Sequence, residues 1–248
     1  MAGQPSKAVL VGATSAIAEH TLRIWLGGGT RAAVLIGRNE AKLESLATDL
    51  RVRFPAATVS VIATELTGVD AIRSAVSASF DGGAPDTVLI AHGSMAEQAD
   101  AQADLAVANE TLQVTAVSVA LWMEAFADAM AAGTIGVIGS VAGDRGRKTN
   151  YVYGAAKGLV ERYAQGLQHR FAGSRLRIVL IKPGPTDTPM TAQLKAKGGS
   201  LASVESVAQG VAAAIAAGRP VAYLPSKWLV IMTVIRLLPA PIFNRLNI

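Results

Sequence analysis

The chain of 248 residues contains no cysteine, and its histidines are limited to His20, His92 and His169. The absence of thiols excludes disulfides, thiolate metal sites and cysteine nucleophiles. Three scattered histidines are too few to predict a metal site, so none is expected. Aromatic residues make up 5% and charged residues 17% of the chain. Few polar side chains are therefore available to carry chemistry.

Long uninterrupted apolar runs are also missing, although 51% of the residues are hydrophobic and the mean hydropathy is +0.36. No stretch reaches the roughly 20 apolar residues that span a bilayer, and the first seven residues lack the apolar part of a signal peptide. We therefore expect a cytoplasmic protein. The net charge of +5 is spread along the chain without a basic stripe interleaved with aromatics, so no nucleic-acid partner is expected.

Short β-rich runs alternate with longer helical patterns. The sequence predicts strands at 7–11, 32–37, 58–63, 86–91, 134–139, 176–181 and 220–224, and helices at 16–26, 39–53, 68–79, 103–130, 150–171 and 205–217. Strands that are apolar throughout suit a parallel sheet covered on both faces. The alternation predicts an α/β doubly wound Rossmann fold: seven parallel strands, helices on both faces, and ligands at the carboxyl ends of the strands.

Residues 1–224 are expected to form one domain, followed by an apolar and basic tail at 225–248. The segment 185–204 is rich in small residues and is predicted to be irregular. It is interpreted either as a mobile lid over a site or as a plain surface loop.

A tyrosine and a lysine stand four residues apart at Tyr153 and Lys157. If the surrounding segment is helical, this spacing puts both groups on one face, about one turn apart. A cation held there would lower the pKa of the phenol toward neutrality. Tyr153 is then a candidate proton donor or acceptor for a carbonyl and alcohol pair. The same spacing also occurs on ordinary solvated helix faces.

Three further segments accompany this pair. They are the strand and glycine turn 8–18, with Gly12; Ser140 at the end of an apolar run, thirteen residues before Tyr153; and the run 178–188, with its Pro-Gly pair. Their order and spacing resemble the short-chain dehydrogenase/reductase family from residue 7 to about 224. The resemblance implies that Ser140 orients a substrate oxygen, Tyr153 is the acid/base, and Lys157 lowers its pKa while binding the nicotinamide ribose.

The resemblance also implies a nucleotide site. The residues expected to contact the cofactor are Gly12, Thr14, Ser15, Ile17, Arg38, Glu65, Leu66, Ala91, His92, Gly93, Tyr153, Lys157, Pro183, Gly184, Thr186 and Thr188. The chain departs from the family at Ala16 and Ala18, where further glycines are usual, and at Ala91, where an asparagine is usual. His92 is unusual at its position and is expected either to touch the cofactor or to bond to the backbone.

Cofactor choice is predicted from the end of the second strand, where NAD-binding proteins carry an acid that bonds to the ribose. This chain has Arg38 there, which can hold the 2′-phosphate of NADP in a fork. NADP is therefore expected ahead of NAD. The alternative is that Arg38 only stacks on adenine or caps the next helix.

The family's proton-relay asparagine has no direct counterpart. A gapless count back from Ser140 reaches Leu112, and a shift of one residue gives Gln113, which we take as the candidate relay residue, with Asn109 as the alternative. A second function class follows from these departures: a nucleotide-binding sensor or scaffold that kept the fold and lost turnover.

The tail carries a nearly apolar run from Trp228 to Ile235, flanked by basic residues. It is too short to span a bilayer, but it can lie in the interface; an oligomer contact or core packing is the alternative. The tail and the loop before Tyr153 resemble family members that reduce polyprenyl-phosphoryl 2-keto-pentoses, which implies a lipid-linked carbonyl substrate; a small-molecule carbonyl substrate is the alternative. The apolar helix predicted at 103–130 favours a homodimer or homotetramer.

Overall fold

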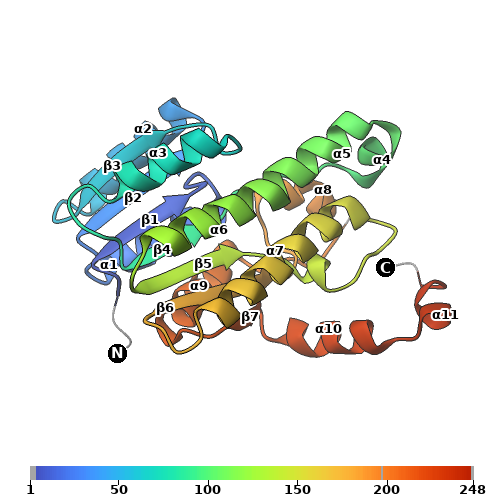
Figure 1. The fold of residues 1–248 in the computed structure, drawn as a ribbon. Coiled ribbons are helices and arrows are strands. Elements are labelled where there is room, and N and C mark those ends of the chain that lie inside the picture. The colour runs from blue at the N-terminus through green and yellow to red at the C-terminus, as the bar shows by residue number, and fades with distance from the viewer. Residues whose placement is uncertain (1–3, 197, 247–248) are drawn as a thin grey trace.

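The computed structural model describes residues 4–196 and 198–246. Seven strands form one parallel sheet (Figure 1). They are β1 (Lys7–Val11), β2 (Ala32–Gly37), β3 (Thr58–Ala63), β4 (Thr87–Ile90), β5 (Gly133–Ile138), β6 (Leu176–Pro183) and β7 (Val221–Leu224). Their order is β3-β2-β1-β4-β5-β6-β7. The predicted seven-stranded doubly wound fold is confirmed.

The helices follow the strands in alternation. They are α1 (Ala16–Gly27), α2 (Glu40–Arg53), α3 (Val69–Ser79), α4 (Gln98–Ala103), α5 (Leu105–Leu112), the π-helix η1 (Gln113–Val117), α6 (Ser118–Ala129), the 3₁₀ turn η2 (Val141–Asp144), α7 (Tyr151–Arg170), the 3₁₀ turn η3 (Pro189–Thr191), α8 (Ala192–Ala196), α9 (Val204–Ala217), α10 (Lys227–Leu237) and α11 (Ala240–Phe243). The single helix predicted at 103–130 is wrong in detail, because a π turn interrupts it and α4 precedes it.

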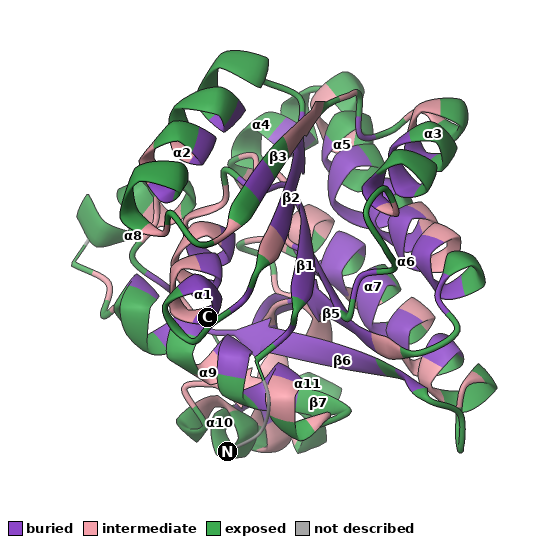
Figure 2. Ribbon diagram, turned by 90° about the vertical axis from the view of Figure 1, so that its left-hand side faces the viewer, coloured by how far each residue is buried: buried purple, intermediate pink, exposed green. Residues whose placement is uncertain are grey.

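The sheet separates two layers of helices (Figure 2). Alternate residues of each strand enter different cores, as the two-residue period of a strand requires. In β1, Ala8 and Leu10 pack in the cluster that includes residues of α1, α2 and α9. Val9 and Val11 pack in the cluster that includes residues of α3, α6 and α7. Burial on both faces explains why residues 8–11 of β1 are all apolar.

The helical stretch Leu105–Ala129 is long and apolar enough to cross a membrane by length and composition. The expectation that no segment reaches that length is therefore wrong on this criterion. Trp122 and Phe126 of this stretch are fully buried, however, and they pack in the core against strand residues. Its apolar character is that of a core helix.

The topological switch point lies between β1 and β4, because β1 pairs with β2 on one side and with β4 on the other. The chain leaves β1, β2, β4, β5 and β6 at the same edge of the sheet, since all strands are parallel. The glycine turn, Arg38, the 91–93 segment, Ser140 and the Pro-Gly pair all stand at these strand ends. The fold thus gathers segments that are far apart in sequence.

The segment 185–204 is less irregular than predicted. It contains η3 and α8, and Thr186 forms a parallel bridge with Ala202. The bridge ties the two ends of the segment together at its base. The segment therefore leaves the sheet edge and returns to it at nearly the same place.

The tail folds back onto the domain. The guanidinium of Arg145, just after η2, donates to the carbonyls of Ile235 and Leu238, each at 2.6 Å. It also lies 3.7 Å from the ring centroid of Phe243. Met232 is fully buried. These contacts fasten α10 and α11 beside the turn that follows Ser140.

Candidate active site

A cleft of about 1120 Å³ opens at the carboxyl edge of the sheet. Most predicted site residues line it: Gly12, Thr14, Ser15, Ile17, Arg38, Leu66, Ala91, His92, Gly93, Ser140, Tyr153, Lys157, Pro183, Gly184, Thr186 and Thr188. Glu65 and Gln113 are not among the lining residues. A smaller cavity of about 390 Å³ contains none of the predicted residues.

Ser140 and Tyr153 meet inside this cleft. Ser140 ends β5 in an extended conformation, and its Oγ accepts a hydrogen bond from the backbone N–H of Ala142 at 3.0 Å. The Ser140 side chain also lies close enough to the phenol of Tyr153 to lower its pKa. Because Oγ already accepts from the backbone, its own hydrogen is left for the phenol oxygen or for a substrate oxygen.

The pKa of Tyr153 differs from the sequence expectation. Burial raises it to about 12, and the Ser140 side chain lowers it only in part. Lys157 does not contribute the expected decrease. Desolvation disfavours the phenolate more strongly than one neighbouring hydroxyl favours it. Tyr153 therefore holds its proton at neutral pH, which is the state that a proton donor to a carbonyl needs.

Lys157 is directed toward the strand end. Its Nζ donates to the carbonyl of Ile138 at 2.8 Å and lies 5.8 Å from the ring centroid of Tyr153. Burial lowers the pKa of Lys157 to about 8. A Cβ added to Gly93 would lie 3.6 Å from this Nζ, so the ammonium stands next to the β4 end of the cleft. The lysine and the tyrosine share one face, as predicted from their spacing.

The turn after β1 requires glycine. Gly12 has φ of +75°, and a Cβ there would lie 2.7 Å from His92. Ser15 is the N-cap of α1, and its side chain makes no capping bond. The first backbone N–H groups of α1 therefore have no side-chain partner. They lie at the positive end of the helix dipole, next to the cleft. Such a helix start is a ready anion site.

Arg38 follows β2 and is exposed at the rim of the cleft. Lys42 also lines this part. Glu65, which was expected beside the adenine, is exposed instead. Its Oε1 accepts from the backbone N–H of Leu66 at 2.9 Å and from the Thr67 hydroxyl at 2.8 Å. These bonds hold the carboxylate on its own loop, and the hydrogen bond from the Thr67 side chain is the largest of the effects that lower its pKa.

His92 is buried and bonds to a side chain rather than to the backbone. Its Nε2 lies 2.8 Å from the Oγ of Ser118, which donates its single hydrogen to the carbonyl of Leu66 at 2.5 Å. Nε2 must therefore carry a proton, and Nδ1 is a buried acceptor without a partner. Burial, followed by the charges of Lys157 and Arg38, lowers the pKa of His92 to about 3, so the ring is neutral.

The relay residue predicted from sequence is wrong. Gln113 and the alternative Asn109 are both exposed, and neither lines the cleft. Thr115, in the π-helix, points inward instead: its Oγ1 accepts from the N–H of Ser94 and donates to the carbonyl of Ser94, each at 2.8 Å. Sequence reasoning missed Thr115 because a π turn holds one extra residue and rotates the following side chains.

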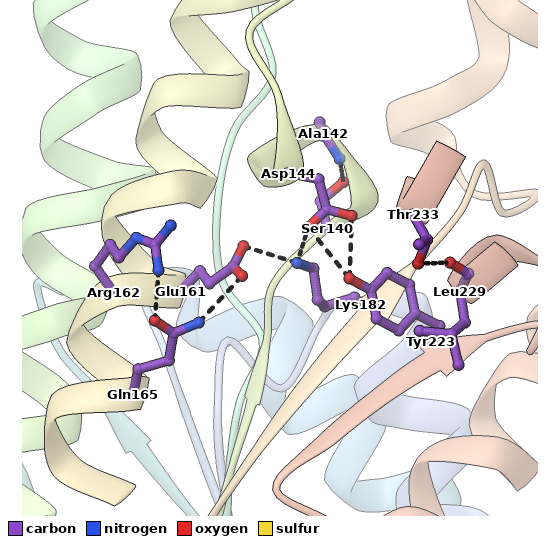
Figure 3. Close-up of polar contacts among 10 residues, drawn as sticks. All are labelled: Ser140, Ala142, Asp144, Glu161, Arg162, Gln165, Lys182, Tyr223, Leu229 and Thr233. Atoms are coloured by element: carbon purple, nitrogen blue, oxygen red, sulfur yellow. Dashed lines mark hydrogen bonds and ion pairs between the residues drawn. The ribbon is translucent and has the colours of Figure 1, made fainter. Parts of the chain in front are cut away.

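A buried cluster of charges lies beside the turn that follows Ser140 (Figure 3). Lys182 in β6 forms ion pairs with Asp144 of η2 and with Glu161 of α7, the latter at 2.7 Å. The hydroxyl of Tyr223 in β7 donates to Asp144 at 3.2 Å. Burial disfavours the lysine charge, but the two carboxylates outweigh this effect and raise its pKa. The cluster joins the four elements β6, η2, α7 and β7.

The Pro-Gly segment forms the remaining wall. The hydroxyl of Thr186 donates to the carbonyl of Gly184 at 2.9 Å, and Thr188 caps η3. A Cβ at Gly184 would overlap the indole of Trp228. The first turn of α10 therefore packs directly behind the cleft wall.

Known proteins resemble this chain in both sequence and structure. The short chain dehydrogenase family matches residues 6–199. An uncharacterized oxidoreductase of Mycobacterium tuberculosis is 31% identical over 244 residues, which cover 96% of each chain. A short chain dehydrogenase from Burkholderia cenocepacia, solved in complex with NADP, has a TM-score of 0.83 at 20% identity and covers 100% of this chain and 99% of its own.

A short chain dehydrogenase/reductase from Burkholderia phymatum, solved in complex with NAD, has a TM-score of 0.79 at 21% identity, over 93% of this chain and 92% of its own. The two cofactors in these neighbours leave the choice between NADP and NAD open. The family match covers most of the chain and includes Ser140, Tyr153 and Lys157. The chain therefore belongs to the short-chain dehydrogenase family and is an NAD(P)-dependent dehydrogenase/reductase.

Proposed function

We propose that the protein transfers hydride between NADP(H) and a ketone or secondary alcohol, with Ser140, Tyr153 and Lys157 as its catalytic residues. The observation that carries this proposal is that all three side chains line one cleft together with the glycine turn of Gly12. The residues present fit a dinucleotide, because the start of α1 offers unpaired N–H groups and the neutral His92 offers a buried acceptor for a hydroxyl hydrogen.

In this mechanism the reduced nicotinamide, when bound, supplies a hydride to the carbonyl carbon. Tyr153 donates its proton to the carbonyl oxygen, and its raised pKa keeps that proton in place until charge develops on the oxygen. The Ser140 hydroxyl orients the same oxygen. The ammonium of Lys157 holds the nicotinamide ribose and offsets the negative charge that forms on the phenolate.

NADP preference is assigned to Arg38. Replacing Arg38 by Asp is expected to reverse the preference toward NAD, because the charge-assisted fork to a 2′-phosphate contributes about 1.5–3 kcal/mol and the acid would repel that phosphate. Calorimetric titration with NADPH and NADH measures the effect. The same charge change at Arg73, on the exposed surface of α3, is the control. Unchanged relative affinities after Arg38→Asp would remove this assignment.

We further propose that α10 contacts an apolar partner, either a membrane surface or a lipid-linked keto-sugar substrate. Its outer face is largely apolar, with Val230 66%, Val234 56% and Leu237 78% exposed. Lys227 and Arg236 flank this face. Apolar burial stabilises such contact by about 25 cal/mol per Å², and each basic residue near an anionic surface by about 1 kcal/mol. The protein would then be cytoplasmic with peripheral membrane contact.

Placing charges on this face tests the proposal. The double variant Val230→Glu and Val234→Glu is expected to abolish co-sedimentation with anionic vesicles while NADPH affinity stays unchanged, since neither side chain is buried. Val52→Glu is the matched control, because Val52 is 77% exposed on α2, away from the tail. Wild-type protein that stays in the supernatant would contradict membrane contact.

Self-association is proposed through the outer face of α5 and the π-helix. Leu105 is 84%, Leu112 37% and Val117 37% exposed there, so a second copy is needed to cover them. We expect light scattering at micromolar concentration to give the mass of a homodimer or homotetramer. A monomer mass would contradict this assignment.

A further inference from the structure

We propose that the cleft contains a subsite for an anionic group of the substrate, formed by the guanidinium of Arg147 and the side-chain amide of Gln98. The inference rests on the proposed oxidoreductase function and names its substrate class: a carbonyl compound that carries a carboxylate, phosphate or sulfonate. The two residues come from different segments, the loop before α7 and the start of α4. Both line the cleft together with Tyr153.

Arg147 is a cation without a partner in the described part of the chain. Its Nε is buried and makes no hydrogen bond, and none of its guanidinium nitrogens forms an ion pair with a described residue. A buried guanidinium donor is costly to leave unpaired. Among the surface cations near this loop, Lys148 is exposed to solvent and needs no partner.

The neighbouring groups do not satisfy Arg147. Asp144 lies close enough to raise its pKa against the larger effect of burial, but that carboxylate is bound by Lys182 and Tyr223. The guanidinium of Arg145 is occupied by hydrogen bonds to the carbonyls of Ile235 and Leu238 in the tail. Of the two arginines in this loop, only Arg147 faces the cleft.

Gln98 presents a second unpaired donor. Its Oε1 accepts from the backbone N–H of Val152, in the first turn of α7, at 3.1 Å. Because that donor is a backbone N–H, the oxygen must face Val152 and the amide nitrogen must face away. Nε2 is buried without a partner. Gln98 therefore binds the first turn of α7, the helix of Tyr153, through its amide oxygen. Its amide nitrogen is directed away from α7 and keeps both hydrogens for another acceptor.

The charges of the whole cleft favour an anion. Arg38, Lys42, Arg147 and Lys157 line it, against Glu19 and Glu97. Arg38 and Lys42 stand at the nucleotide end, after β2, whereas Arg147 and Gln98 stand at the Tyr153 end. An anion bound by Arg147 would therefore belong to the substrate. The buried oxygen of Asn150, which also lines the cleft without a hydrogen-bond partner, can accept a hydroxyl hydrogen of the same molecule.

The test compares matched carbonyl substrates and ligands on the full-length protein. Steady-state NADPH oxidation is measured with a keto acid, a keto phosphate and the neutral methyl ester of the keto acid. Arg147→Met is expected to lower kcat/KM for the anionic compounds by about 10- to 100-fold, mainly through KM, because a charge-assisted fork is lost. The ester should change by less than about 3-fold on the same grounds.

Two further variants isolate the subsite. Gln98→Glu keeps an acceptor for the N–H of Val152 and replaces the free amide by a carboxylate oxygen, so it should impair the anionic substrates selectively. Lys148→Met removes the adjacent exposed cation and should change neither class. An Arg147→Met variant that affects ester and acid equally would overturn the subsite.

Calorimetry of the same anions with the NADPH-bound protein separates this inference from the proposed function. Anion binding that depends on Arg147, in a protein that reduces no carbonyl compound, would support the subsite and remove the reductase assignment. Reduction of neutral ketones alone, with no binding of either anion, would support the reductase and overturn the subsite.

Discussion

Replacing Tyr153 by Phe is expected to lower kcat by about 100- to 10,000-fold, the range that a positioned general acid contributes. In the proposed mechanism the phenol is the proton donor, and burial raises its pKa to about 12. The substitution removes only the hydroxyl and leaves the ring in place. NADPH affinity should therefore stay within a few-fold of wild type, and single-turnover kinetics with an active ketone measure the loss.

The same helix supplies the control for this prediction. Tyr151 is 43% exposed and does not line the cleft, so Tyr151→Phe should leave kcat unchanged. A Tyr153→Phe variant with near-normal kcat would mean that another group donates the proton. The described cleft offers Ser140 as the nearest alternative hydroxyl.

Replacing Lys182 by Met is expected to lower the free energy of unfolding by about 3–5 kcal/mol, because two carboxylates are left buried without their cation. A domain of this kind is stable by only about 5–15 kcal/mol, so the variant should be close to unfolding. The side chains of Lys182 and Asp144 are each 1% exposed. Urea denaturation followed by circular dichroism measures the change.

Two companion variants decide whether the charge is responsible. Lys195→Met breaks an exposed ion pair with Asp187 and should cost less than about 1 kcal/mol. Adding Asp144→Asn and Glu161→Gln to Lys182→Met removes the uncompensated charges and should recover part of the loss. A stability of Lys182→Met within about 1 kcal/mol of wild type would show that water reaches the cluster.

The strand ends were predictable from sequence, because largely apolar strands in alternation with helices define a parallel sheet whose carboxyl edge collects the loops. The spacing of Tyr153 and Lys157 indicated only that they share a helix face; the family resemblance added Ser140 and the expected roles of all three. Gln113 was mispredicted since a residue count assumes a regular α-helix, and η1 breaks that regularity. Glu65 does not line the cleft, because its carboxylate bonds to Leu66 and Thr67 of its own loop, which residue order alone does not predict.

The buried charge cluster and the pKa of Tyr153 could not be predicted from the spacing of residues in the sequence. Lys182 follows the apolar run 178–181 of β6, which signals that a partner must neutralise it, but its partners are 38 and 21 residues away. Only the packing of η2 and α7 against β6 brings them together. The pKa of Tyr153 depends on how completely the phenol is desolvated, and a neighbouring lysine at the right spacing does not determine that.

Hydride transfer to a carbonyl carbon is the reaction that we propose for this cleft. The most direct test incubates the protein with NADPH deuterated at the transferable position of the nicotinamide and with a panel of neutral and anionic ketones, followed by mass spectrometry of the alcohols. We expect one deuterium on the carbinol carbon of at least one product, formed by wild type and not by Tyr153→Phe. Bound NADPH with no deuterated alcohol from any ketone would contradict it and would favour a protein that senses the nucleotide without turning it over.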